Sequence, residues 1–285
     1  MTPFDIRGTK RRQIKDRIFS GFVWALTFSC LIVVFIILFY LFEKGIGSIN
    51  WALFTKGPKP VGEFGGGIAN AIVGSLIVVV VAAIIAIPLG ISVGIYQADN
   101  RGKRIAERIA VAVDVLQGIP SIVIGIVIYV WIVKPFGGFS AISGSIALAI
   151  MMLPPVIKST EETLLLIPHT LKEAALGLGA SYYHTVRKIL IPTGMGGILG
   201  GCIIGVARIA GEVAPLLFTA FGNPAMVFSI FKPVDTIPKV IFAYASSPYE
   251  DWQRIAWGGS LILVVFIIIL NTIIKLFENK WKVQF

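Results

Sequence analysis

Charged residues are scarce in this 285-residue sequence, at 14% of the chain against about 25% in a typical soluble domain. Hydrophobic residues make up 56% of it, and several apolar runs are longer than the roughly 18 residues that indicate a transmembrane helix. This composition excludes a soluble globular domain. We therefore expect an all-α integral membrane protein.

Cysteine and histidine are also scarce, with two residues of each. Cys30 and Cys202 lie inside apolar runs without a CxxC motif or a histidine-rich neighbourhood, so they support neither a disulfide framework nor a metal site. His169 and His184 are fifteen residues apart and form no HExxH motif, so we interpret them as surface histidines. No bound metal, cofactor or catalytic residue is expected.

The sequence has no G-x-x-x-x-G-K-[ST] loop, so this chain is not expected to bind ATP itself. Gly90–Gly94 matches the G-x-S-x-G pattern of hydrolases, but it lies in a long apolar run without a strand-turn-helix context. We interpret it as small-residue helix packing. No catalytic set converges in the apolar runs, which disfavours a membrane-embedded enzyme.

The apolar runs predict six transmembrane helices. Pro88 is expected to bend the second, Gly118–Pro120 interrupts the third, and Pro154–Pro155 should end the fourth. The transmembrane domain proper is expected over residues 68–277, after a basic segment at 1–17. The predicted spans cover residues 18–42, 68–96, 109–133, 141–157, 192–221 and 255–274, with a polar loop at 158–191.

Lysine and arginine are distributed unevenly between the segments that join these spans. With the N-terminus in the cytoplasm, seventeen fall on inner segments and seven on outer ones. This asymmetry follows the positive-inside rule, so it predicts cytoplasmic N- and C-termini and a cytoplasmic loop 158–191. It also accounts for the net charge of +10 without invoking nucleic acid.

The polar loop holds the most informative segment, residues 173–192, which read EAALGLGASYYHTVRKILIP. Glu173–Ala175 favour a helix, and Thr170, three residues earlier, suggests a capping box. Gly179 can end a short helix in the left-handed conformation. Pro192 suits the first turn of the next helix. A helix-turn-helix is therefore predicted, either as a docking element or as a surface hairpin without a partner.

The register of this segment resembles the EAA loop of ABC-importer permeases, with Ile191 in place of the usual leucine. The resemblance implies a type I ABC importer permease fold. It also implies that the loop docks on a separate ATPase subunit, which would bind the ATP and Mg²⁺. The residues to which it assigns this coupling are Glu173, Ala174, Ala175, Gly179, Ile189 and Pro192.

Arg208 and Glu212 are the only charged residues deep in a predicted span. On one continuous helix they would share a narrow face with Pro215 and several glycines, which would let another helix or a solute approach closely. Arg208–Glu212 is either an internal ion pair, or a pair on the translocation path in which Arg208 binds a passing oxyanion. The glycines of this helix-packing face are Gly194, Gly197, Gly201 and Gly205.

Four further segments sharpen the resemblance. Gln117–Gly125 and Arg208–Leu217 resemble phosphate importer permeases, and Gly62–Asn70 and Pro233–Trp252 resemble the A-type permease subunit of the bacterial high-affinity phosphate importer. The resemblance implies a phosphate permease in the bacterial inner (cytoplasmic) membrane that forms half of the path. Its partners would be a second, C-type permease, two ATPase subunits and a phosphate-binding protein.

Two other functions stay open at this stage. The same machine could transport another oxyanion, such as sulfate or molybdate, or the chain could be an ion-coupled secondary transporter with the charged pair of the fifth span as its relay. Asp114 is expected either to face water at the inner mouth or to cap a neighbouring helix. Four outer acids either meet the binding protein or are simply solvated: Glu63, Asp235, Glu250 and Asp251.

Overall fold

The computed structural model describes residues 6–63 and 65–281, and within these ranges the chain is helical without a β-strand. Four helices are long and apolar enough to cross a membrane. Two pairs of bent helices would bring the number of spans to the predicted six. The four long helices are α1 (Ile6–Ile46), α3 (Ala69–Asp99), α6 (Ala141–Leu165) and α13 (Glu250–Trp281).

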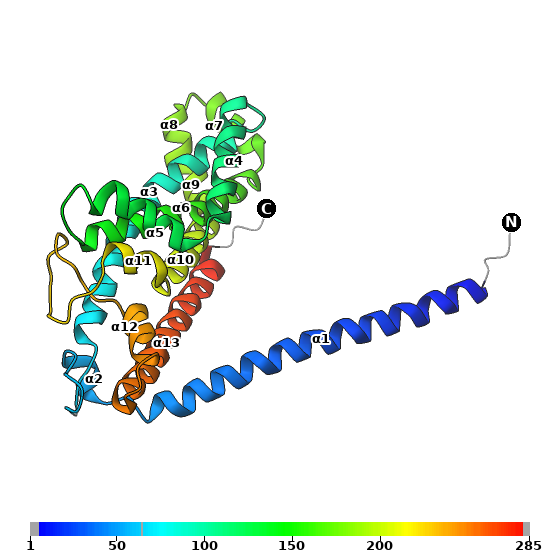
Figure 1. Ribbon diagram of the computed structural model, residues 1–285. Coiled ribbons are helices and arrows are strands. Elements are labelled where there is room, and N and C mark those ends of the chain that lie inside the picture. The colour runs from blue at the N-terminus through cyan, green and yellow to red at the C-terminus, as the bar shows by residue number, and fades with distance from the viewer. Residues whose placement is uncertain (1–5, 64, 282–285) are drawn as a thin grey trace.

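Helix α6 forms the centre of the bundle (Figure 1). Leu148, Met152 and Val156 are fully buried on it, and α3 packs along one side. Gly90 and Gly94 of α3 allow this close approach, because added Cβ atoms there would lie 2.7 Å from Val156 Cγ1 and 2.6 Å from Thr160 Cβ. The G-x-S-x-G segment is thus part of a helix-packing surface.

The prediction that Pro154–Pro155 ends the fourth span is wrong, because α6 continues through both prolines to Leu165. The turns after the prolines are held from two sides. Helix α3 packs on one side, and α10 (Met195–Ala210) packs on the other through its glycines. Tertiary packing therefore overrides the local preference of proline to end a helix.

The third predicted span, 109–133, is not one straight helix. Helix α4 (Arg104–Gly118) is followed by α5 (Ser121–Ile128) and a π-helical turn η1 (Tyr129–Val133), with a bend of 103° between the two parts. Ile119 precedes a proline and has an extended backbone with ψ of 127°. A residue before proline is disfavoured in the helical region, which explains the break.

The fifth predicted span, 192–221, is also divided. A helical stretch over residues 182–193 meets α10 at a bend of 73°, and Gly194 lies at this junction. A second break separates α10 from α11 (Ala214–Thr219), which begins with Pro215 at its first turn. Gly211 follows the end of α10 directly, and glycine is a poor helix former.

Helix α1 leaves the bundle at an angle and contacts it only near its C-terminal end (Figure 1). Every side chain from Arg12 to Tyr40 is exposed. The contact with α13 consists of Tyr40 packed edge-on against Trp257 and Gly45 packed against Leu261. The first helix is therefore structurally separate from the rest of this chain.

The remaining short helices mark the two ends of the bundle (Figure 1). Helices α2 (Trp51–Thr55) and α12 (Ile237–Ala245) lie at one end, and α7 (His169–Gly177) and α8 (Tyr182–Thr185) lie at the opposite end. Helix α3 joins the two ends, since its 31 residues span about 46 Å at 1.5 Å per residue.

Candidate functional site

The EAA-like segment folds as a helical hairpin at one end of the bundle, which we call the EAA hairpin (residues 169–193). Its first helix, α7, carries Glu173 and Ala174 exposed to solvent and Ala175 buried against the bundle. The helix begins at His169 after Pro168, without a side-chain cap. Thr170 therefore lies inside the helix, and the predicted capping box is wrong.

Gly179 makes the turn between the two arms of the EAA hairpin. Its φ of +84° is the left-handed conformation expected of it, which glycine adopts without a steric penalty. Leu178 directly before it is 90% exposed at the tip of the hairpin. The second arm begins after Ser181, whose side chain accepts a hydrogen bond from the backbone N–H of His184 at 3.3 Å. The turn thus presents its tip outward.

Pro192 lies near the end of the second arm, in the first turn of its last short helical segment, as expected from the sequence. Helix α8 continues through a π-helical turn, η2 (Val186–Leu190), into α9 (Ile191–Thr193). Proline has no N–H and its ring clashes with the carbonyl four residues earlier, so the turn before it widens into a π-helix. Ile189 is half-buried in this wide turn.

The outer face of the EAA hairpin is apolar and aromatic as well as charged. Leu176 is 40% exposed, and Tyr183 is 66% exposed, with Arg187 donating a hydrogen bond to the Tyr183 hydroxyl at 2.9 Å. His169 and His184 are on the surface of this hairpin, as interpreted from the sequence. An exposed apolar face rimmed by charges is typical of a protein-binding surface.

The EAA hairpin is bonded to the end of α3 through Asp99. The Lys172 ammonium lies 2.5 Å from one carboxylate oxygen of Asp99, and the Tyr182 hydroxyl donates to the other oxygen. Sequence reasoning did not find this contact, because the partners are 73 and 83 residues away along the chain. Asp99 lies three residues beyond the predicted end of the second span, so its place at the end of a helix became visible only in the structure.

The glycines of the fifth span face α6. An added Cβ at Gly197 would lie 2.2 Å from Thr163 Oγ1, and one at Gly201 would lie 2.2 Å from Ser159 Cβ. Gly205 packs on Met152, and Gly194 packs on Thr163 at the bend. The sequence left open whether another helix or a solute approaches this face. In the structure, helix α6 of the same chain packs against it.

Arg208 and Glu212 do not share a helix face, which corrects the geometry expected from the sequence. Helix α10 ends at Ala210, so Glu212 and Pro215 lie beyond the break. Arg208 is exposed in the last turn of α10, where a positive charge is favourable to the helix dipole. No Arg208–Glu212 salt bridge is found among the described residues, so the internal ion pair is not supported there.

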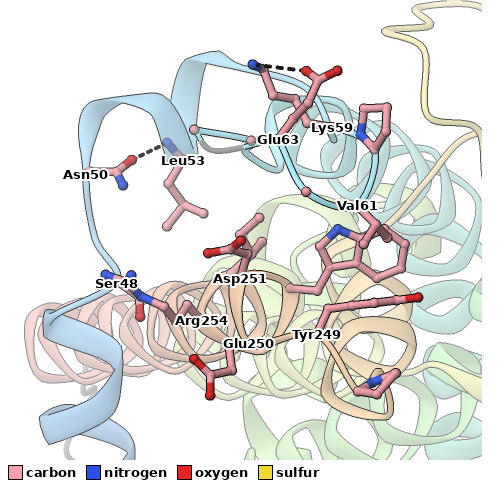
Figure 2. A pocket seen from close by; sticks show the side chains of 17 residues that line it. Ser48, Asn50, Leu53, Lys59, Val61, Glu63, Tyr249, Glu250, Asp251 and Arg254 are labelled. Carbon is pink, nitrogen blue, oxygen red and sulfur yellow. Dashed lines mark hydrogen bonds and ion pairs between the residues drawn. The ribbon is translucent and has the colours of Figure 1, made fainter.

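A cavity of about 490 Å³ lies at the opposite end of the bundle, between the loop before α3 and the start of α13 (Figure 2). Glu250 and Asp251 line it from α13 together with Arg254. Lys59 and Glu63 lie on the loop across from them and form an ion pair at 3.3 Å. Three of the four predicted outer acids thus come together at one cavity.

The fourth outer acid, Asp235, is not on this surface. Its side chain is buried and lies 3.0 Å from the Lys239 ammonium. Burial raises the pKa of the Asp235 carboxyl, and the positive charge of Lys239 offsets part of that shift. Asp235 is therefore a structural residue of the outer loop, and the expectation that it meets a binding protein or is solvated is corrected.

Asp114 forms an ion pair with Lys158 at 2.6 Å and so joins α4 to α6. Its side chain is 59% exposed on the surface of this chain. Its partner is a side chain of α6 rather than the end of a neighbouring helix.

Comparison with known proteins gives a consistent result. The family model described as binding-protein-dependent transport system inner membrane component matches residues 86–283. The phosphate transport system permease protein PstA of Yersinia pestis is 39% identical over 273 residues, covering 95% of this chain and 92% of the relative. The protein of the same name from Xylella fastidiosa (strain 9a5c) is 42% identical over 257 residues, covering 87% of this chain and 88% of the relative.

Among solved structures, a chain of the MetNI methionine ABC transporter in an inward-facing form matches with a TM-score of 0.63. The match covers 76% of this chain and 96% of that chain at 18% identity, so it concerns the fold alone. It confirms the predicted all-α importer-permease fold. With a family model over more than half of its length and relatives well above 30% identity, the chain belongs to the family of binding-protein-dependent transport system inner membrane components.

Proposed function

We propose that this chain is the transmembrane permease subunit of an ATP-driven phosphate importer in the bacterial inner membrane. It forms half of the translocation path and is coupled to ATPase subunits, which bind the ATP and Mg²⁺, through the EAA hairpin. The assignment of phosphate as the substrate rests on the name of relatives that match nearly the whole chain. That shared name is phosphate transport system permease protein.

The shape of the EAA hairpin supports the ATPase contact. Glu173 is exposed on α7, and the exposed apolar residues Leu176 and Leu178 lie at and near the tip. Helix α13 starts at the end opposite the hairpin, and its C-terminal part runs toward the hairpin end of the bundle (Figure 1). Because the basic loop after α3 lies at this end as well, the positive-inside rule supports a cytoplasmic position for the hairpin and both termini.

The separation of α1 supports a second permease subunit. An apolar helix that is exposed over almost its whole length has a large surface available for packing against another transmembrane helix. In this proposal the C-type permease packs against α1, and two ATPase subunits bind beneath the pair of permeases.

Arg208 is proposed to lie on the translocation path. It is exposed at the last turn of α10, next to the break before α11. A guanidinium binds an oxyanion with two parallel hydrogen bonds, which suits phosphate. Glu212 follows the break on the same segment. In this proposal its carboxylate competes with the anion for Arg208, so the anion is held less tightly.

The outer cavity supports the contact with a phosphate-binding protein. Glu63, Glu250 and Asp251 line this cavity, and so do the basic residues Lys59 and Arg254 (Figure 2). A surface with both signs of charge can orient a soluble partner by complementary charges.

The test is phosphate uptake by proteoliposomes that hold this chain with its candidate permease, ATPase and binding-protein partners. We expect uptake that requires ATP and is not suppressed by excess sulfate. ATP-dependent uptake that sulfate or molybdate suppresses would reassign the substrate to another oxyanion. Uptake by this chain alone, driven by an ion gradient, would replace the proposal with a secondary transporter.

Variants at two positions locate the function within the chain. Glu173→Ala is expected to leave ATP hydrolysis in place while phosphate uptake falls, because the charged contact with the ATPase is lost. Arg208→Ala is expected to reduce uptake in a normally assembled complex, and Arg208→Lys to restore it only in part, since lysine has no planar fork. Normal uptake in both Arg208 variants would remove this residue from the path.

A further inference from the structure

One acidic side chain holds both arms of the EAA hairpin. Asp99 is the last residue of α3, and its two carboxylate oxygens have different partners. Lys172 reaches it from α7, one residue before Glu173, and Tyr182 reaches it from the first turn of α8. The Lys172 ammonium also lies over the Tyr182 ring, 5.4 Å from its centre. The three side chains form a compact cluster between α3 and the hairpin.

The position of this acid is unfavourable for α3 considered alone. A carboxylate at a helix C-terminus faces the negative end of the helix dipole, a cost of about 0.3–1 kcal/mol for an exposed group. No residue of α3 compensates this charge among the described contacts; the compensation comes from Lys172 and Tyr182 of the hairpin. Since the side chain of Asp99 is only 16% exposed and that of Lys172 only 25%, salt screens this pair less than it screens a pair of fully exposed charges.

The other end of α3 is bonded to the outer loop 222–236 and to the first residue of α12. The Asn70 side-chain amide donates to the carbonyl of Asn223 at 2.9 Å, and the Ser75 hydroxyl accepts from the N–H of Ile237 at 2.8 Å. Gly74 packs so closely that an added Cβ would lie 2.0 Å from the carbonyl oxygen of Asp235. Helix α3 is thus a continuous connection from the EAA hairpin to the outer loop.

We propose that Asp99 is the positioning residue that fixes the EAA hairpin to α3, so that ATP-driven displacement of the hairpin moves α3 and, through it, the outer loop. This inference rests on the proposed function, because it requires an ATPase that moves the hairpin. It assigns a role in transmission to Lys172 and Tyr182 as well, which face α3 rather than the ATPase.

The test uses the assembled complex in proteoliposomes, with Cys30 and Cys202 replaced by serine and Thr236 replaced by cysteine. Thr236 is 2% exposed in the outer loop, so a membrane-impermeant maleimide reacts with Thr236→Cys only when the loop moves. ATP is expected to change the labelling rate of this parent complex. In Asp99→Asn the change should shrink roughly fivefold or more, a coupling typical of distant sites, while ATP hydrolysis continues.

Two control variants distinguish a loss of transmission from the hairpin to the outer loop from a general loss of protein structure. The exchanged pair Asp99→Lys with Lys172→Asp restores the opposite charges and is expected to recover the ATP response. Glu162→Gln removes an exposed acid near the end of α6 and should leave the response unchanged. An unchanged ATP response in Asp99→Asn, or no recovery in the exchanged pair, would overturn the proposal.

The labelling test needs no phosphate, so it separates the two proposals. A complex that hydrolyses ATP and moves the outer loop, but takes up no phosphate, overturns the substrate assignment and leaves the role of Asp99 in place. A complex that takes up phosphate with ATP, yet shows the same loop movement in Asp99→Asn, overturns only the role of Asp99. A complex whose outer loop does not respond to ATP at all overturns the transmission through α3.

Discussion

Helices α1 and α6 are both apolar and long enough to cross a membrane, but they have opposite environments. Of the 18 residues in the most apolar stretch of each helix, 67% are buried in α6 and none in α1. Helix α1 is also the more hydrophobic of the two. Of these two helices, the more hydrophobic one is therefore the one without packing partners in this chain along most of its length.

The side chains explain the difference. Helix α6 carries serine and threonine, and it meets glycines from α3 and α10, so that helix backbones approach closely. Helix α1 instead carries exposed aromatic residues, such as Phe35 stacked on Phe39 with ring centres 6.4 Å apart. Lipid tails solvate large apolar side chains as well as a protein core does, so small residues mark the packed helices.

The largest effect is expected where a small residue holds two helices together. Gly201→Leu would place a side chain where Ser159 already lies, since even a Cβ would be 2.2 Å from Ser159 Cβ. Overpacking should lower the free energy of unfolding by about 3 kcal/mol, measured by denaturant unfolding in detergent micelles. Gly21→Leu in α1 is the matched control, because nothing lies within 4 Å of an added Cβ there. Equal losses in both variants would contradict this account of packing.

A second, smaller effect tests whether α1 packs on a partner. Phe35→Ala combined with Phe39→Ala should leave the free energy of unfolding of this chain unchanged, because the two side chains are 68% and 61% exposed. The same change should reduce co-purification with the second permease, through lost packing at their interface. Undiminished co-purification would mean that α1 is covered by lipid, and the proposed interface would then lie elsewhere.

The smallest effect is expected at a polar contact on the surface. Asp114→Asn removes the ion pair with Lys158 that joins α4 to α6, whose side chains are 59% and 33% exposed. Such pairs contribute about 0–1 kcal/mol. A double-mutant cycle with Lys158→Met, measured by the same unfolding assay, isolates this term. A coupling energy far above this range would show that charges as well as glycines hold α6 in place.

Much of this architecture could be predicted from the sequence. Apolar runs located the spans, and the spacing of Glu173, Gly179 and Pro192 located the hairpin, because these are local properties of the chain. The family resemblance agrees with the family model and with the relatives. The break at Gly118–Pro120 was visible as an interruption, although its 103° angle was not.

What could not be predicted depends on contacts between distant segments. Pro154–Pro155 did not end α6, because glycines of two other helices pack against the turns that follow. The helical alignment of Arg208 with Glu212 failed because α10 ends between them, at Ala210. The cluster around Asp99 joins residues more than 70 positions apart, and no pattern along a single sequence reports such a contact.

The independence of α1 has a consequence for biogenesis. A helix whose main packing partner is α13, and which meets it near its own C-terminal end, can enter the bilayer during translation before the rest of the chain exists. Helix α6 cannot reach its final packing until α10 has been made, because the glycines of α10 complete its surroundings. Insertion and assembly are therefore separated in time within one chain. Early steps on the ribosome depend on hydrophobicity, and the late steps depend on shape.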